Sequence, residues 1–401
     1  MTDAKYVKKA PRQSNLELSR ILAMYLIVMH HFSVHGGVSI WSGSAPLSFN
    51  FYLDQLLSTG GKIGVNLFVL ITGYFLAKKF SKFSSLIYLW IKTFSYVIVF
   101  FLLFCALGLH PFNWSSLISC FFPIRNDFYW FVSAYFLLIL LSPFITIGIK
   151  ALGQRKLFTF LLIFGFFWSV IPTLTTKPEY YGSTLFWFVY LFSWGAFLRD
   201  YLERKIFSQS LCLSVCGASW GIIAIIIALA DWNNRVGTFI GYIDWFTFAN
   251  LYSVFSLICA LSLFVFFKQM QIGYKPWINK FAAAMFGVYL IHENPIVYPW
   301  LWSKVFHVPE YLGSSWFILY ALAVITIVFF ICAILDLIWE KVLQSGYQKY
   351  FFPRLQPLDK RVTIRLNEEE FTILVEYAQN HDITVTQAVK SCIQEKILNR
   401  C

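Results

Sequence analysis

Windows of about twenty mostly apolar residues recur along most of the chain, and no other feature limits its possible folds so strongly. A window of that length matches one helical crossing of a bilayer, and in hydrocarbon only helices and closed barrels satisfy the backbone. The chain is 58% hydrophobic and 13% charged, which is typical of polytopic membrane proteins. We therefore expect an all-α polytopic membrane protein with about ten transmembrane helices. The expected spans are residues 15–34, 62–78, 85–108, 128–149, 156–175, 183–199, 210–230, 247–267, 281–298 and 315–340.

The distribution of Lys and Arg predicts the orientation of these spans. With a cytoplasmic N-terminus, most of the basic residues between spans fall on the inner side, and the five outer loops hold Lys62, Arg125, Lys177, Arg235 and Lys304. This asymmetry follows the positive-inside rule, so both termini are expected in the cytoplasm and the protein in a plasma membrane. The net charge of +12 then reflects topology more than a nucleic-acid partner.

Two ionisable residues stand inside the first expected span. Arg20 and His31 are eleven residues apart, which is about three helical turns, so they share one face of a helix. The rise between them is about 16 Å, roughly half of a bilayer core. Because ionisable side chains inside a span are costly, they usually face a protein interior or a wet cavity and mark function. His30 points about 100° away from that face and is expected to be structural.

The cysteines of the chain suggest neither a disulfide framework nor a metal site. Most of the eight cysteines fall inside expected spans, where cysteine acts as a small hydrophobe, and none has the spacing of a zinc site. We expect no structural metal. The N-terminal apolar stretch is interrupted by Arg20, His30 and His31, so it does not read as a cleavable signal. Residues 35–61 are expected to form an outer loop long enough to fold over a site.

The C-terminal part differs in character. Residues 361–366 alternate apolar and polar side chains, which predicts a strand, and Asn367 then caps a helix opened by three glutamates. A second amphipathic helix is expected from Thr384. The expected organisation is a transmembrane domain over residues 1–345, a linker over 346–357 and a small cytoplasmic α+β module, strand-helix-helix, over 358–401.

Four sequence motifs together resemble one known family. The first span has an arginine, ten residues and then a histidine; GVNLFVLITGYFLAKK (residues 64–79), DFYWFVSAYFLLILLSPFI (127–145) and FGVYLIHENP (286–295) follow in order. This series resembles the integral-membrane acyltransferase-3 family, of the type that acts on surface polysaccharides. Thr72 stands where that family usually has a serine. The four motifs together extend the resemblance over residues 15–340.

The resemblance implies an O-acyltransferase that moves an acetyl group from cytoplasmic acetyl-CoA to a carbohydrate hydroxyl at the outer face. It makes His31 the catalytic candidate and Arg20 the cation on the donor side. The chemistry agrees, because a sugar hydroxyl needs a base near neutral pH and a guanidinium suits the phosphates of CoA. Direct transfer and an acyl-histidine relay both remain open. The acceptor would be an exopolysaccharide, a capsule or another cell-wall glycan of a bacterium.

Other residues are candidates for supporting roles. His292 is expected at the level of His31, with Glu293 able to orient an imidazole and Tyr289 on nearly the same face; the alternative is an interfacial helix end. Arg125 and Asp127 adjoin the motif at Trp130 and could contact substrate, or could form an ordinary surface salt bridge.

The donor side departs from the family in one respect. Many members have paired arginines at the start of the third span, whereas this chain has lysines there. Lysine binds phosphate as a point charge, so the expected cofactor-binding residues are Arg20, Lys78, Lys79, Lys82 and Lys92.

The pattern of the tail resembles the ribbon-helix-helix fold, in which two chains pair one strand each. Residues 358–401 contain nearly equal numbers of basic and acidic side chains, which argues against DNA binding and for a homodimerisation or docking module.

Two other functions for the whole chain stay open: a membrane carrier or flippase for a lipid-linked sugar or small molecule, and a membrane-anchored regulator. No inverted repeat in the sequence supports the carrier. A regulator does not explain the pair of Arg20 and His31 in the first span.

Overall fold

The computed structural model describes residues 13–36, 40, 48–78, 83–124, 128–175, 184–202, 207–236, 241–350, 367–381, 385, 388 and 389. Its regular elements, within those residues, are all helical. They are α1 (Ser14–His35), α2 (Phe49–Leu76), α3 (Phe83–Ala106), α4 (Trp114–Cys120), α5 (Trp130–Gly165), the π-helix η1 (Phe166–Val170), α6 (Ile171–Thr175), α7 (Thr184–Asp200), α8 (Gln209–Val236), α9 (Phe246–Ala249), α10 (Val254–Gln269), α11 (Pro276–Ala283), α12 (Met285–His292), α13 (Val297–Trp300), the π-helix η3 (Leu301–Val305), α14 (Val308–Tyr311), α15 (Phe317–Tyr350) and α16 (Glu368–Asn380).

Six helices of the described chain are long and apolar enough to cross a membrane, so the expected count of about ten is not supported. One reason is that some of the expected windows lie in helices that are more polar or shorter than a membrane span. α1 carries Glu17, Arg20 and three histidines, which lower its hydropathy, and α7 has only 17 residues. The window at 281–298 is divided between the short helices α11, α12 and α13.

A second reason is the continuity of the α5 region. The windows at 128–149 and 156–175 both lie in the helical stretch Trp130–Thr175, in which two helices meet at a kink without an intervening loop. Inside it Gly153 has φ 66° and ψ 177°, a conformation open to glycine but strained for other residues. The sequence therefore predicted an interruption near the right place, and the structure makes it a kink at one glycine rather than a loop.

The expected outer loop at 35–61 is wrong over much of its length. Its second half is the start of α2, where the side chain of Ser48 accepts a hydrogen bond from the backbone N–H of Phe51 and caps the helix. Phe51 and Asp54 are buried there, so this part of α2 packs inside the protein.

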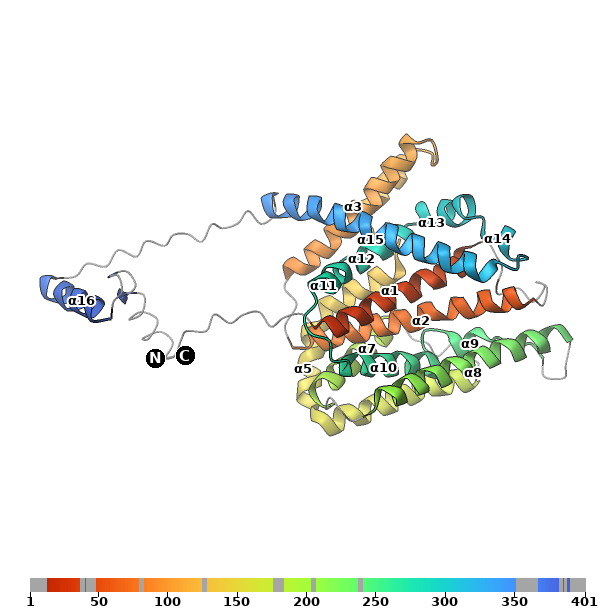
Figure 1. Ribbon diagram of the computed structural model, residues 1–401, viewed down its shortest axis with the longest axis horizontal. Coiled ribbons are helices and arrows are strands. Elements are labelled where there is room, and N and C mark those ends of the chain that lie inside the picture. The colour runs from red at the N-terminus through yellow and green to blue at the C-terminus, as the bar shows by residue number, and fades with distance from the viewer. Residues whose placement is uncertain are drawn as a thin grey trace. The chain divides into compact units, whose positions relative to one another are not determined.

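α1 lies inside the helical bundle, between α2 on one side and α12 and α15 on the other (Figure 1). Two glycines of α2 permit the close approach of α1: a Cβ at Gly61 would overlap the ring of His30, and one at Gly64 would overlap the carbonyl oxygen of Ala23. Almost every side chain of α1 from Ala23 to Ser33 is at least partly buried. The polar helix is therefore shielded by protein, which is where ionisable residues are tolerated in a membrane.

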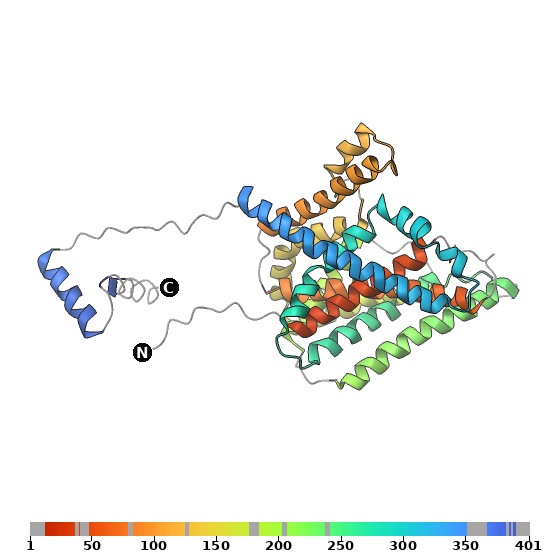
Figure 2. The same cartoon turned by 45° about the horizontal axis from the view of Figure 1, so that its top comes forward.

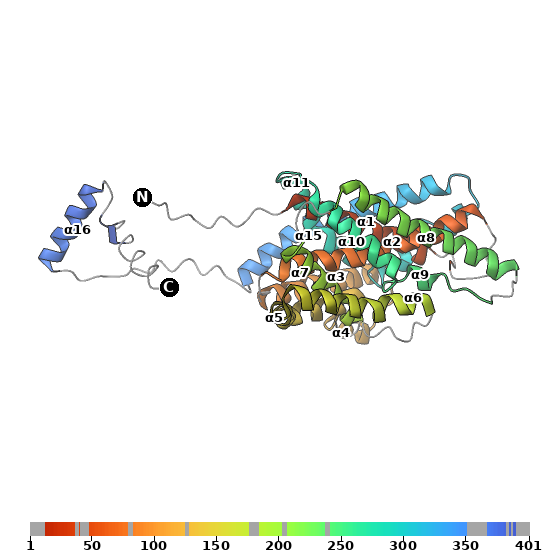
Figure 3. The ribbon, with the colours of Figure 1, turned by 90° about the horizontal axis from the view of Figure 1, so that it is seen from below.

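Apolar side chains cover the outer surface of the bundle. α3 leads with α4 away from the rest (Figure 2), and α8 lies on the side of the bundle that faces the viewer in Figure 3. Large residues such as Leu102, Phe144, Ile225 and Ile338 are exposed on α3, α5, α8 and α15. An exposed apolar surface of this kind is what helices in contact with lipid present.

The chain separates into two compact units, Met1–Gln344 and Ser345–Cys401. In the second unit Asn367 caps the start of α16, as its sequence predicted, and the side chain of Glu370 completes a reciprocal capping box. The expected strand at 361–366 lies outside the described residues, and so does most of the expected second helix.

Candidate active site

Three side chains from two distant parts of the chain meet at the C-terminal half of α1. His31 comes from α1, and His292 and Glu293 come from the end of α12. The Nδ1 atom of His31 lies 2.8 Å from Nε2 of His292 and 3.2 Å from Oε2 of Glu293. Both histidines are buried. Gly287 allows α12 to approach α15 closely, because a Cβ at that position would overlap the carboxylate of Asp336 on α15.

The hydrogen bonds determine which nitrogen of each imidazole carries a proton. The Nδ1 atom of His292 lies 2.5 Å from the carbonyl oxygen of Val288, and since a carbonyl only accepts, this nitrogen donates. Nε2 of neutral His292 is then an acceptor, so Nδ1–H of His31 donates to it. The lone pair of His31 is left on Nε2, which makes that atom available as a base or nucleophile.

A third histidine, not considered from the sequence, joins this cluster. His35 lies one turn beyond His31 on α1, and its Nε2 is 3.0 Å from the same Oε2 atom of Glu293. The ring of His35 stacks on Tyr298, with centroids 4.2 Å apart. Glu293 is thus held between two imidazoles. The four-residue spacing of His31 and His35 could have indicated this from the sequence, because residues four apart share a helical face.

Tyr289 lies beside the cluster, and Trp130 lies beside a further cation, Lys62. The ring centroid of Tyr289 is 6.2 Å from that of His31, as expected from its position on α12. Trp130 faces Lys62, whose Nζ is 5.8 Å from the Trp130 ring centroid and 5.7 Å from that of Phe246. Lys62 was assigned only to a topological role from the sequence, yet it lies near Glu293, with which it interacts electrostatically.

Arg20 lies on the N-terminal half of α1, apart from the histidines. Its Nη1 atom is 2.5 Å from Oε2 of Glu17, one turn earlier. The guanidinium also lies over two rings of α2, 5.8 Å from the centroid of Phe68 and 6.0 Å from that of Phe75. The structure therefore places a cation at one end of α1 and an imidazole cluster at the other.

The lysines expected to hold the donor are in different surroundings. Nζ of Lys92 is buried between α3 and α15, 2.8 Å from Oδ1 of Asp336 and 2.9 Å from Oε2 of Glu340. Two carboxylates already neutralise it, so this arrangement does not favour a role for Lys92 in phosphate binding. Lys78 is exposed just after α2. Lys79, Lys82, Arg125 and Asp127 lie outside the described residues.

The cluster has donor atoms that a metal could use. One ligand atom each from His31, His292 and Glu293 lie within 4.8 Å of one another. The contact of 2.8 Å between the two imidazole nitrogens is nevertheless a hydrogen-bond distance. Two nitrogens bound tetrahedrally to one zinc ion at about 2.0–2.1 Å would lie roughly 3.3 Å apart. The geometry therefore fits a proton-sharing pair better than a pair of metal ligands.

Comparison with known proteins adds two matches. Residues 13–336 match a family model described as an acyltransferase domain. Residues 360–400 match a family of unknown function. No curated protein and no solved structure matches the chain. The first match includes α1, α12 and every residue of the cluster described above.

Proposed function

The chain belongs to the acyltransferase-3 family, whose model it matches over residues 13–336, and on this basis we propose that it is a membrane O-acyltransferase. In this proposal it moves an acetyl group from acetyl-CoA on the cytoplasmic side to a hydroxyl of a carbohydrate on the outer side. The observation that carries the proposal is the free lone pair on Nε2 of His31, created by the bond from its Nδ1–H to His292.

In the direct reaction Nε2 of His31 removes the proton of the acceptor hydroxyl. The hydroxyl oxygen attacks the acetyl carbonyl, a C–O bond forms, the C–S bond of the thioester breaks, and the proton passes from Nε2 to the leaving thiolate of CoA. Glu293 and His292 orient the ring, and the carboxylate stabilises the imidazolium that forms. In a relay Nε2 would instead attack the acetyl carbon first, the C–S bond would break, and CoA would leave as the thiolate. The acceptor oxygen would then form the C–O bond as the N–C bond breaks, and its proton would pass to the released Nε2 and on to the thiolate.

Several parts of the chain support the direction of transfer. Arg20 stands about 16 Å from His31 along α1, on the end that the positive-inside rule assigns to the cytoplasm. A cation on that side suits the phosphates of CoA. Trp130, with Arg125 and Asp127 before it in the chain, is a candidate acceptor contact, since aromatic faces pack against sugar rings. We place the enzyme in a bacterial plasma membrane with both termini in the cytoplasm.

The acceptor is proposed to be an exopolysaccharide, a capsule or another cell-wall glycan. The test is the acetyl content of cell-surface glycans, measured by proton NMR in a deletion strain rescued with wild type or with His31→Ala. Loss of one acetyl signal, restored only by wild type, supports the proposal and names the acceptor. Unchanged acetylation in all strains, with equal expression, would contradict it and favour the carrier function.

We also propose that the C-terminal unit joins two copies of the chain. Ile373 and Tyr377 of α16, four residues apart on one helical face, are at least one-third exposed, and a second copy could cover them. The test is the molar mass of the full-length protein in detergent, by light scattering. A dimer that becomes a monomer with Ile373→Lys, but not with Thr372→Lys, supports the proposal. A monomeric wild type overturns it.

A further inference from the structure

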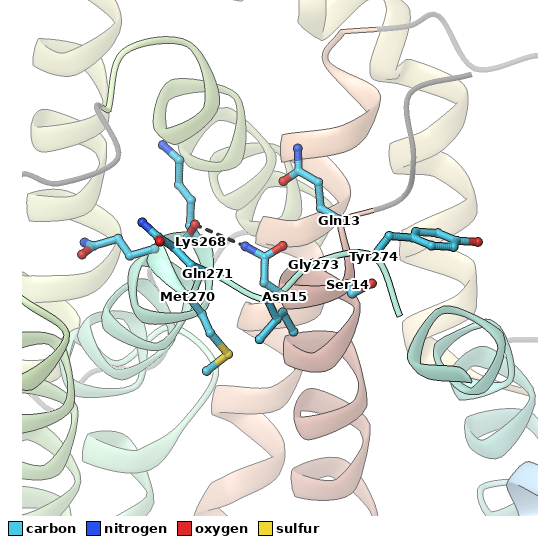
Figure 4. Close-up of a pocket in the computed structure, with 10 residues that line it drawn as sticks. Gln13, Ser14, Asn15, Lys268, Met270, Gln271, Gly273 and Tyr274 are labelled. Atoms are coloured by element: carbon cyan, nitrogen blue, oxygen red, sulfur yellow. Dashed lines mark hydrogen bonds between the residues drawn. The ribbon is translucent and has the colours of Figure 1, made fainter. Parts of the chain in front are cut away.

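A polar pocket of about 520 Å³ lies where α1 begins and α10 ends (Figure 4). Its walls are the start of α1 and the segment that joins α10 to α11. The lining residues are Gln13, Ser14, Asn15, Lys268, Gln269, Met270, Gln271, Ile272, Gly273 and Tyr274. Its volume falls within the range of about 300–1,000 Å³ that is usual for small-molecule sites.

The pocket is in line with the two ionisable residues of α1. Gln13 immediately precedes the first turn, and Arg20 and His31 follow it by seven and eighteen residues. Those spacings are close to two and five helical turns, so the three side chains fall on one stripe of α1 about 27 Å long. The contacts agree, because Gln13 accepts a bond of 3.4 Å from the hydroxyl of Tyr74, the neighbour of the Phe75 ring that lies beside Arg20.

The pocket walls are held by side chain to backbone bonds. The amide of Asn15 donates to the carbonyl of Phe267 at 2.8 Å and to that of Lys268 at 3.2 Å (Figure 4). The hydroxyl of Ser14 accepts from the backbone N–H of Lys275 at 2.8 Å. The ammonium of Lys268 donates to the carbonyl oxygens of Leu198 and Leu202. The pocket is therefore formed before any ligand enters, which lowers the entropic cost of binding.

The groups left to meet a ligand are amides and one aromatic ring. Gln13, Gln269 and Gln271 supply amides, and Nε2 of Gln269 is buried with no hydrogen-bond partner among the residues described. A glutamine amide can pair with the N6 and N7 atoms of adenine. Tyr274 is 57% exposed, so its ring is open to a stacked base. Lys275 follows directly and could meet a phosphate.

We propose that this pocket binds the adenine nucleotide end of the acyl-CoA donor, with the pantetheine arm running past Arg20 along the stripe to His31. The inference rests on the proposed function, and it places the nucleotide at α1 and α10 rather than at the lysines before α3.

The first experiment measures binding by the full-length protein in detergent, using two probes: CoA and adenosine 3′,5′-bisphosphate, which lacks the pantetheine arm. Tyr274→Ala and Gln271→Leu should each weaken both probes, the first by roughly 5- to 100-fold because a stacked base is lost. Trp277→Ala is the matched control, since Trp277 is another exposed aromatic residue close by that does not line the pocket. His31→Ala should bind both probes as wild type does.

The outcomes separate the two proposals. Tight CoA binding that none of the pocket variants changes would overturn the pocket and leave the acyltransferase proposal standing. A wild type that binds neither probe would overturn the CoA donor, and the pocket with it. A second measurement needs no variant: an 8-azidoadenosine analogue of CoA, photolysed on the wild type, should label residues 268–274. Labelling confined to residues 77–92 would assign the nucleotide to the lysines instead.

Discussion

Nδ1 of His31 lies 2.8 Å from Nε2 of His292, although the two residues are 261 positions apart in the chain. This contact joins the first helix of the bundle to the end of α12. It also directs the proton of His31 to one nitrogen and leaves the other as a base. The main predictions about catalysis follow from it.

Replacing His31 should abolish transfer without removing the donor site. With His31→Ala we expect acetyl transfer to fall by at least about 10²-fold, the range of a lost general base, while CoA binding stays at the wild-type value. His307→Asn is the control, because His307 is exposed and asparagine tolerates its left-handed backbone. Full activity of a folded His31→Ala protein would contradict the mechanism.

The rate of transfer should depend on the hydrogen-bond acceptor that His292 supplies to His31 more than on the imidazole ring of His292. His292→Phe removes the atom that accepts from Nδ1–H of His31, so we expect transfer to fall by roughly 10-fold or more. His292→Gln keeps an acceptor oxygen in reach and should recover part of the activity. The readout is the rate at saturating acetyl-CoA, with binding measured separately. Equal loss in the two variants would mean that the imidazole itself has another role.

His35 should act through Glu293. His35→Phe keeps the stacking on Tyr298 but removes the 3.0 Å contact with the carboxylate. A hydrogen bond to a charged group contributes about 1.5–3 kcal/mol, so we expect a loss of roughly 10- to 100-fold if Glu293 turns away from His31. The pH profile of the rate should shift as well. An unchanged rate and profile would show that His31 alone is enough to hold Glu293.

Lys92 should affect stability rather than donor affinity. Lys92→Met leaves the buried Asp336 and the partly buried Glu340 without their cation, and breaking a buried pair costs about 3–5 kcal/mol. We expect a clearly lower Tm in detergent and an unchanged KM for acetyl-CoA in the folded fraction. A raised KM with an unchanged Tm would restore the phosphate-binding role that the sequence suggested.

Chelators should leave the activity unchanged. The distance of 2.8 Å between His31 and His292 fits a hydrogen bond better than shared metal coordination. Treatment with EDTA, followed by metal analysis of the purified protein, checks this expectation. Activity that is lost with EDTA and restored by zinc would make His31, His292 and Glu293 metal ligands.

The sequence alone was enough for features that depend on local periodicity and composition. The apolar windows predicted a helical membrane protein, and six of the helices described are able to span a bilayer. The spacing of Arg20 and His31 predicted one face of a helix, because the period of 3.6 residues is a local property. The capping box at Asn367 and Glu370 is also local, and the structure contains it.

Only the tertiary structure decided which helices meet and which charges neutralise each other. Composition did not show that α2 extends back to Phe49, that the helices between Trp130 and Thr175 meet at a kink at Gly153, or that α1 packs against protein. It also did not pair Lys92 with Asp336 and Glu340, or bring His35 to Glu293. These contacts join segments far apart in sequence. They depend on how the helices pack and on close approaches at residues such as Gly61 and Gly287. A local sequence pattern holds no information about the residue that lies across such an interface.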